Sequence, residues 1–422
     1  MVAHALPRQI ALFQETAFVT GGPSSWANDS TPFYAIEPDV SGVAQVSLEN
    51  ENIRPRTRAK HQNILGLKNC EFSFSAYMHG KPSNAAEGAA ATAFHLSTLL
   101  KSALGGADLG YGIGIADAGA NPDEIEVDSD PGFAVGDFIF CHDTSATSGQ
   151  FYRIVSIAAG PPVVLTLDRD LHFTADAGGA DRAYAVIDCY IHQAAAAQHD
   201  HANHTTMQFQ VQGEGTEDVW ILKGVKPQLS IEGIAAGEPT KISFGCMVTT
   251  FDHETASKAT FAAAPAGEAG NVPGVADTTL FLMATHGDPL ASVAALGSIS
   301  VEPGVGYDRV MGPNGYEGVH GHVDNLNDTT LEVMVPFDDD YATEYRAQTE
   351  KHALIQVGTT VGAWGVYFPQ LEYAQEPARN DEGALTGSTL SFRGRENQDS
   401  IGALTGDNAE KFRSPFHILI VA

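Results

Sequence analysis

A short pattern that occurs twice constrains this chain more than any other feature. Residues 227–229 and 369–371 both read Pro-Gln-Leu, and each tripeptide opens an alternating strand that runs into a polar, glycine-containing turn. The chain then returns as a second strand carrying Ser-Phe, at residues 243–244 and again at 391–392. A helical segment precedes each hairpin, and another alternating strand precedes each helix. The repeat predicts two copies of one strand–helix–strand–hairpin unit, which is typical of proteins that build a surface or a lattice.

Length and composition indicate a folded, β-rich protein. A chain of 422 residues is too long for one ordinary core and is expected to form two or three domains. Its 43 glycines favour many turns and short strands. Hydrophobic and charged contents of 43% and 18% are those of a folded chain.

The chain is strongly acidic. It has 23 Lys and Arg against 52 Asp and Glu, which gives a formal net charge of −29. This charge excludes binding to nucleic acid through a general phosphate-neutralising surface. A surface that repels DNA can itself serve a function, and a halophilic or marine origin is an alternative source of the acidity.

Neither cysteine motifs nor membrane signals are visible in the sequence. Four cysteines are widely spaced, without a Cys-x-x-Cys pair, and three of them lie among apolar strand residues that favour buried thiols: Cys70, Cys189 and Cys246, the fourth being Cys141. The first 18 residues lack the pattern of a signal peptide, and no apolar run approaches the ~20 residues that a membrane helix needs. We therefore expect a chain that is made in a cytoplasm, with no membrane partner.

Changes in composition divide the chain into an arm, two units and an insertion. Residues 1–33 are expected to form an extended N-terminal arm, and residues 34–255 a first domain with a helix at about 89–104. Residues 124–191 contain about five short strands and predict a small β-barrel inserted within that domain. The Ala-, Gly- and Pro-rich segment 256–278 is expected to be a linker. Residues 279–422 form the second domain, with a helix at about 341–354.

One histidine cluster is a candidate metal site. His199, His201 and His204 lie close together beside Asp200, and this set could ligate zinc. The segment follows an alanine run and fits an exposed loop equally simply, so we predict no metal and no cofactor. His320 and His322 form a weaker pair. The three acids at 338–340 are explained by capping of the helix that follows.

One basic run stands out in the acidic chain. Arg54, Arg56, Arg58 and Lys60 alternate, so their side chains share one face if the segment is extended. We predict that this face contacts an acidic surface on another copy of the chain. A solvated loop is the alternative interpretation.

No pattern of catalytic residues can be singled out. The motifs Gly-x-Ser-x-Gly, Walker A and His-Glu-x-x-His are absent from the sequence. We find no arrangement that pairs a nucleophile with a base, and the protein is therefore expected not to be an enzyme.

Several segments resemble a known family of viral structural proteins. Residues 66–80 alternate for most of their length, and residues 220–252 contain the first of the repeated hairpins. Both segments resemble the tail tube proteins (major tail proteins) of long-tailed bacteriophages, and the block around Val135 and Leu167 is similar to insertions found in some members. The resemblance covers most of residues 35–255 and, more faintly, 279–400.

The resemblance implies a fold, an assembly and a location. The fold would be two tandem tail-tube-like β-sandwich or barrel domains, each with one flanking helix, plus the small inserted barrel. The chain would assemble with itself and with other tail proteins into stacked rings, with three two-domain subunits making a pseudo-sixfold ring. The resulting tube would sit in the virion and conduct DNA without binding it specifically, and the inserted barrel would decorate the outside.

Two alternatives come from other classes of protein. One is a metal- or carbohydrate-binding β-protein built around the histidine cluster. The other is a different virion component, such as a capsid decoration protein or a distal tail protein.

Overall fold

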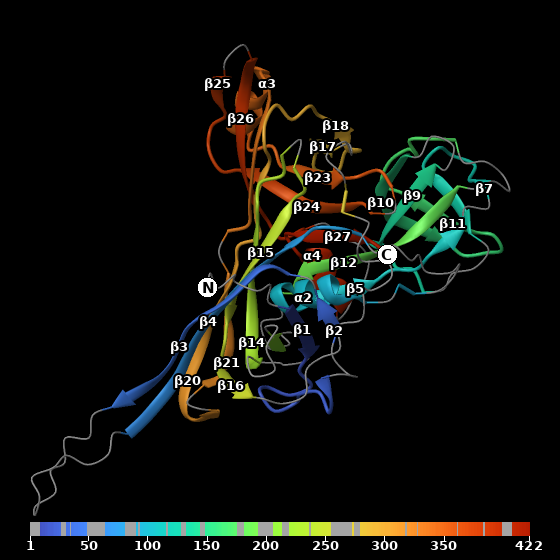
Figure 1. Cartoon of the computed structure of the whole chain (residues 1–422). Coiled ribbons are helices and arrows are strands. Elements are labelled where there is room, and N and C mark those ends of the chain that lie inside the picture. Colours follow the sequence, from blue (N-terminus) through green and yellow to red (C-terminus); the bar gives the residue numbers. More distant parts are fainter. Residues whose placement is uncertain are drawn as a thin grey trace, which may run out of the picture.

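The described part of the chain is mainly β-structure, as the sequence predicts. The computed structural model describes residues 9–26, 31–33, 35–48, 64–80, 90–91, 93–114, 117–127, 132–143, 148–174, 181–192, 206–212, 219–235, 238–254, 272–273, 279–316, 319–326, 328–360, 362–382, 385–398 and 407–422. These residues form two large sheets, a small barrel, a separate two-stranded hairpin at 305–326 and three short helices (Figure 1). No helix within these ranges is long and apolar enough to cross a membrane.

The first sheet is built from eight strands: β1 (Gln9–Gln14), β2 (Thr31–Phe33), β3 (Ile36–Leu48), β4 (Ile64–Tyr77), β13 (Met207–Gln212), β14 (Val219–Ile231), β15 (Lys241–Met247) and β16 (Thr250–Glu254). Their order is β2-β1-β13-β14-β15-β4-β3, and all neighbours are antiparallel. β16 pairs with the first half of β14, opposite β13. β3 and β4 continue beyond the body of the molecule as a long hairpin (Figure 1).

The second sheet is built from nine strands: β17 (Thr279–Thr285), β18 (Ala291–Ser292), β19 (Ser300–Glu302), β22 (Thr330–Pro336), β23 (Lys351–Val357), β24 (Trp364–Tyr373), β25 (Ala378–Glu382), β26 (Leu385–Gly394) and β27 (His417–Val421). Following the pairings gives the order β18-β17-β23-β24-β26-β22-β19. β27 pairs with the first half of β24, and β25 pairs with β26. Between β19 and β22 the chain forms a separate two-stranded hairpin, here called the arm, from β20 (Val305–Tyr316) and β21 (Val319–Leu326).

The two sheets share one topology. The eight strands of the first sheet correspond, in chain order, to eight strands of the second: β1 to β17, β2 to β18, β3 to β19, β4 to β22, β13 to β23, β14 to β24, β15 to β26 and β16 to β27. Each strand pairs with the equivalent neighbours in its own sheet. Helix α2 (His95–Leu104) follows β4, as α3 (Asp340–Ala347) follows β22. We call these sets the first unit and the second unit. The strand–helix–strand–hairpin repeat expected from the sequence is therefore present, and it is larger than the hairpin that signals it.

The repeated hairpins differ in register by two residues. Leu229 of the first Pro-Gln-Leu lies opposite Phe244, whereas Phe392 lies opposite Tyr373, two residues beyond the equivalent Leu371. Because side chains alternate between the faces of a strand, an even shift leaves the same residues facing the core. Both phenylalanines are accordingly buried.

An inserted segment, residues 105–192, separates α2 from β13. It contains β5 (Gly105–Leu109), β6 (Ile113–Gly114), β7 (Asp117–Ala118), β8 (Glu124–Val127), β9 (Phe138–Asp143), β10 (Ser148–Ala158), β11 (Val163–Leu167) and β12 (Arg182–Ile191). The strands expected in 124–191 are present and enclose their own apolar core, which includes Ile139, Tyr152 and Leu165. β12 leaves this small barrel half-way and continues in the second sheet, between β5 and β27. The domain boundaries given above remain predictions.

Three local expectations need correction or extension. Residues 9–14 lie in the N-terminal segment 1–33 that was expected to be extended, but they form β1 inside the first sheet, where Ile10 is fully buried. A deletion of residues 1–20 would therefore remove a core strand. The helix expected at 341–354 ends at Ala347, because Gln348 adopts a left-handed conformation (φ 55°) and β23 then begins at Lys351. Helix α4 (Asp407–Arg413) was not expected. Most of the predicted linker, 256–278, lies outside the described residues.

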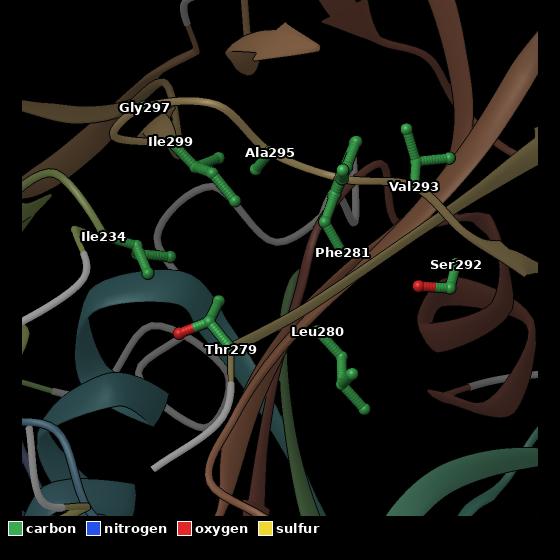
Figure 2. Close-up of a pocket in the computed structure, with 10 residues that line it drawn as sticks. Ile234, Thr279, Leu280, Phe281, Ser292, Val293, Ala295, Gly297 and Ile299 are labelled. Atoms are coloured by element: carbon green, nitrogen blue, oxygen red, sulfur yellow. The ribbon is translucent and has the colours of Figure 1, made fainter. Parts of the chain in front are cut away.

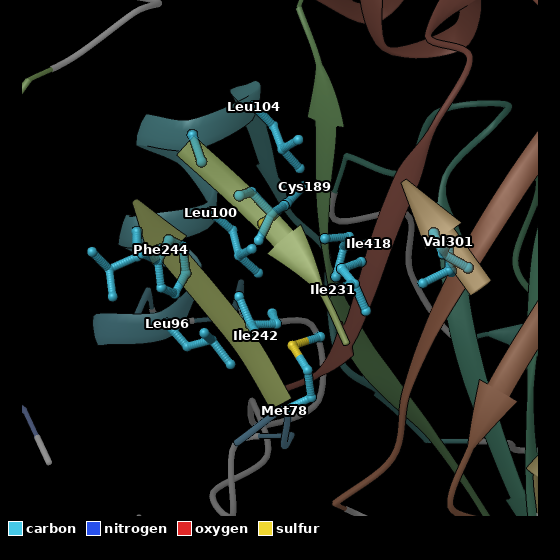
Figure 3. Packing of buried hydrophobic residues seen from close by; sticks show 14 of the residues in the cluster. Met78, Leu96, Leu100, Leu104, Cys189, Ile231, Ile242, Phe244, Val301 and Ile418 are labelled. Carbon is cyan, nitrogen blue, oxygen red and sulfur yellow. The ribbon is translucent and has the colours of Figure 1, made fainter. Parts of the chain in front are cut away.

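Helix α2 joins the two sheets in one core. Its leucines recur at helical spacing, and it packs against β14 on one side and β5 and β12 on the other. Figure 3 shows Leu96 and Leu100 of α2 beside Ile242 of the first sheet, with Ile418 of the second sheet nearby. The helix ends at Leu104, and Gly105 caps it with a positive φ of 95°. Truncating Leu100, which is fully buried, is expected to cost about 2–5 kcal/mol.

Candidate assembly surfaces

The outer strand of the first sheet presents an open edge. β3 is the last strand of its sheet, and among the described residues it pairs with β4 alone. Asp39 and Ser41 on β3 are exposed. β4 pairs with β15 only from Glu71 to Tyr77, so its first seven residues have β3 as their one strand partner within the described chain. Unpaired N–H and C=O groups along such an edge can accept a further strand.

The equivalent edge of the second unit meets the first unit. Ile299, directly before β19, forms an antiparallel bridge with Ile234, which follows β14. The two backbone hydrogen bonds of this bridge measure 2.8 and 2.9 Å. The edge that is open in the first unit is therefore engaged in the second, by the other half of the same chain.

The arm of the second unit docks on the first unit through Tyr307. The Tyr307 hydroxyl donates to the carbonyl oxygen of Ala103 in the last turn of α2. Lys226 Nζ lies 4.3 Å from the centroid of the Tyr307 ring and donates to the carbonyl of Ser102. Gln228 Nε2 donates to the Tyr307 carbonyl at 3.0 Å. A cation at the carbonyl end of a helix is favourable, and the contact with the ring adds a cation–π attraction.

A histidine and an arginine make the second part of this dock. His322 Nε2 lies 3.2 Å from the carbonyl oxygen of Gly224 and 3.4 Å from Thr249 Oγ1, and its ring packs edge-on against Phe18. Burial is the main reason that the pKa of His322 falls to about 4, so the imidazole is neutral at pH 7. Arg309 Nη2 donates to the carbonyl of Val248 at 2.6 Å.

The predicted site residues fall mostly outside the part of the chain that the structure describes. This applies to Arg54, Arg56, Arg58 and Lys60, and to His199, His201 and His204. Within the described ranges no cluster of His, Cys, Asp and Glu could hold a metal ion. His322 belongs to the dock of the arm.

The acids at 338–340 lie at the start of α3, as expected. Asp338 accepts a hydrogen bond from the Asp340 amide at 3.0 Å, and Asp339 is the N-cap residue through its backbone. The docking residues Tyr307, Lys226 and Gln228 were missed by sequence reasoning. The local signal was Lys226, one of two lysines in a strand that is otherwise largely apolar.

The junction of the two units also contains a pocket of about 350 Å³ (Figure 2). It is lined by Ile234 from the first unit and by residues 279–281, 292–295, 297 and 299 from the second. None of these lining side chains is charged, so they offer no anchor for an ionic ligand, and Thr279 and Ser292 supply their hydroxyl groups.

Comparisons with known proteins give no independent identity. No protein-family model matches the chain, and no curated protein matches it significantly. Support for a function therefore comes from the internal repeat and from the junction between its two units.

Proposed function

We propose that the chain is a self-assembling structural subunit, a tail-tube-like protein whose rings stack into an acidic tube for passage of DNA. The observation that carries the proposal is the asymmetry between two equivalent edges. Within one chain, the β19 edge of the second unit abuts the first unit, while the outer side of β3 has no pairing strand among the described residues. Repeating the internal junction between copies joins β3 of one chain to the second unit of the next.

The repeat also supports a particular receiving surface for β3 in this proposal. Ile234 lies three residues beyond Ile231 of β14, and Tyr373 of β24 is the sequence equivalent of Ile231. The receiving position on the neighbour is therefore near Glu376, in the exposed turn between β24 and β25. Such a head-to-tail contact closes into a ring if its rotation allows closure, and two units per chain make a three-chain ring pseudo-sixfold. The net charge of −29 fits a channel wall that repels DNA.

The direct test is electron microscopy of the purified full chain, with a mass measurement on the same sample. Hollow tubes or stacked rings with three copies per ring are expected. A chain that remains monomeric when concentrated contradicts the proposal. Discrete closed oligomers without tubes would instead favour a decoration or distal tail protein.

Two neighbouring proline variants test the role of the β3 edge. Backbone N–H groups alternate in direction along a strand, so Val40→Pro and Ser41→Pro remove one outward and one inward N–H. The variant that removes the N–H pointing away from β4 should keep its melting temperature and lose assembly. The variant that removes the N–H pointing toward β4 should lose stability, because it breaks the β3–β4 ladder. Normal assembly by both folded variants would show that β3 is not the contact.

A further inference from the structure

The inserted segment belongs to the first unit in sequence but packs on the second. β12 pairs with β27 from Val186–Val421 to Tyr190–His417, and the Ala422 amide donates to the Ala185 carbonyl at 2.9 Å. β5 then pairs with the other edge of β12. The first unit thus contributes two strands to the sheet of the second.

A glutamine side chain extends this attachment to the small barrel. Gln356 on β23 is fully buried, and its Oε1 accepts a hydrogen bond from the Phe151 amide of β10 at 3.1 Å. Its Nε2 donates to the carbonyl of Gly149 at 2.7 Å. One side chain therefore pairs with the backbone of β10 as a neighbouring strand would.

Buried charges form a second attachment. Lys411 of α4 is 4% exposed and lies between the carboxylates of Asp108 on β5 and Asp137 before β9. Burial alone would lower the pKa of Lys411, but these two carboxylates and that of Asp188 outweigh it and raise the pKa, so the ammonium stays charged. Removing one partner of a buried pair leaves an uncompensated charge.

Apolar contacts complete the interface. Phe138, Phe140 and Phe151 of the inserted segment share a buried cluster with residues of the second unit, including Leu354, Tyr367, Leu419 and Val421. The rings of Phe138 and Tyr367 meet edge-on, 5.1 Å between centroids. This cluster is distinct from the core inside the small barrel, so it serves the attachment.

The second unit has no comparable segment. α3 ends at Ala347 and β23 begins at Lys351, whereas residues 105–192 lie between the equivalent elements α2 and β13. We propose that the inserted segment is an intramolecular brace that fixes the two units as one rigid body. One junction of the repeat is then permanent and the equivalent junction between chains is left to form during assembly. The brace stands on the contacts above, and its consequence for rings rests on the proposed function.

Hydrogen exchange on the full chain tests the brace. Gln356→Ala combined with Lys411→Met should speed exchange of the Ile234 and Ile299 amides at the junction at least tenfold. The amides of Phe74 and Phe244, inside the first sheet, should not change. Ser156→Ala is the matched control, because its hydroxyl bonds to Thr166 within the barrel and away from the second unit. Unchanged exchange at the junction in a folded double variant would overturn the proposal.

An excision variant provides a second measurement. The Gly110 amide donates to the Val186 carbonyl at 2.9 Å, so residues 111–185 can be replaced by a two-residue Asn-Gly turn. Small-angle scattering should show a broader distribution of shapes than the parent. The same distribution for both proteins would contradict the brace.

The tests of brace and ring have separable outcomes. The proposed function alone would be contradicted if the parent chain never forms rings while the double variant still exchanges faster at the junction than the parent. Normal three-chain rings from a double variant whose junction exchange is unchanged would contradict the brace alone.

Discussion

His322 Nε2 lies 3.2 Å from the carbonyl oxygen of Gly224, at the point where the arm of the second unit meets the first sheet. The buried ring faces Lys226 and Arg309, whose positive charges add to the effect of burial in lowering the pKa of His322 to about 4. His352 on β23, which is held by the carbonyl of Asp288 at 2.8 Å, also has its pKa lowered to about 4, mainly by burial. Docking of the arm thus depends on a neutral imidazole at His322, whereas the His352 contact lies within the second unit.

These two histidines predict an acid-sensitive fold. The unfolded state takes up protons below pH 6.5 and the native imidazoles do so only near pH 4, so their stabilisation is complete above 6.5 and is lost as the pH falls. Each imidazole should lower the free energy of unfolding by about 1.4 kcal/mol per pH unit in that window. Urea unfolding at pH 6.5, 5.75 and 5.0 measures the slope, and His322→Gln should reduce it by about 1.4 kcal/mol per pH unit. An unchanged slope in the variant would show that His322 titrates normally.

Gly224, whose carbonyl contacts His322, should tolerate substitution by alanine much less well than Gly245 does. Gly224 has φ +58°, and an added Cβ would lie 2.8 Å from both Thr249 Oγ1 and Val19 Cγ2. Gly224→Ala should therefore lower the free energy of unfolding by about 1–3 kcal/mol, through backbone strain and crowding together. Gly245→Ala on β15 is the control, because nothing lies within 4 Å of its Cβ position, and it should be nearly neutral. Chemical denaturation of both variants compares them; equal stability would contradict the crowding at Gly224.

The sequence predicts the repeat well because hairpins are local. The alternation at residues 227–231 and the Ser-Phe echo mark strands that pair with near neighbours in the chain, as β14 and β15 do. The helix expected at 341–354 begins close to the predicted position, because the acids at its start are a local signal, but it includes the first four residues of β23. A short run such as 353–355, Ala-Leu-Ile, does not by itself separate a strand from a buried helix. The dock of Tyr307 on Ala103 joins residues far apart in sequence, and no local pattern records it.

The four cysteines are predicted to be inert in the native protein. All are buried; burial raises the pKa of Cys70 to about 11 and raises the pKa of Cys141, Cys189 and Cys246 as well. Since the thiolate is the reactive form, a disulfide reagent at pH 8 should label none within minutes and all four in guanidinium chloride. Rapid labelling of any cysteine in the native protein would show that its strand opens readily.

The basic run at Arg54, Arg56 and Arg58 is predicted to act between chains. Replacing all three with serine should reduce assembly without changing the melting temperature, because the run lies in the segment between β3 and β4 and its expected partner is an acidic surface of another copy. Raising the salt from about 0.05 to 0.5 M should weaken assembly of the parent similarly, since charges are screened over a few ångströms at high ionic strength. Arg413→Ser is the control, since its side chain is 60% exposed and its pair with Glu396 spans 3.8 Å. Sedimentation measures the assembled fraction of each variant. If the triple variant and the control assemble equally, the run is a solvated loop and the contact between chains rests on the β3 edge alone.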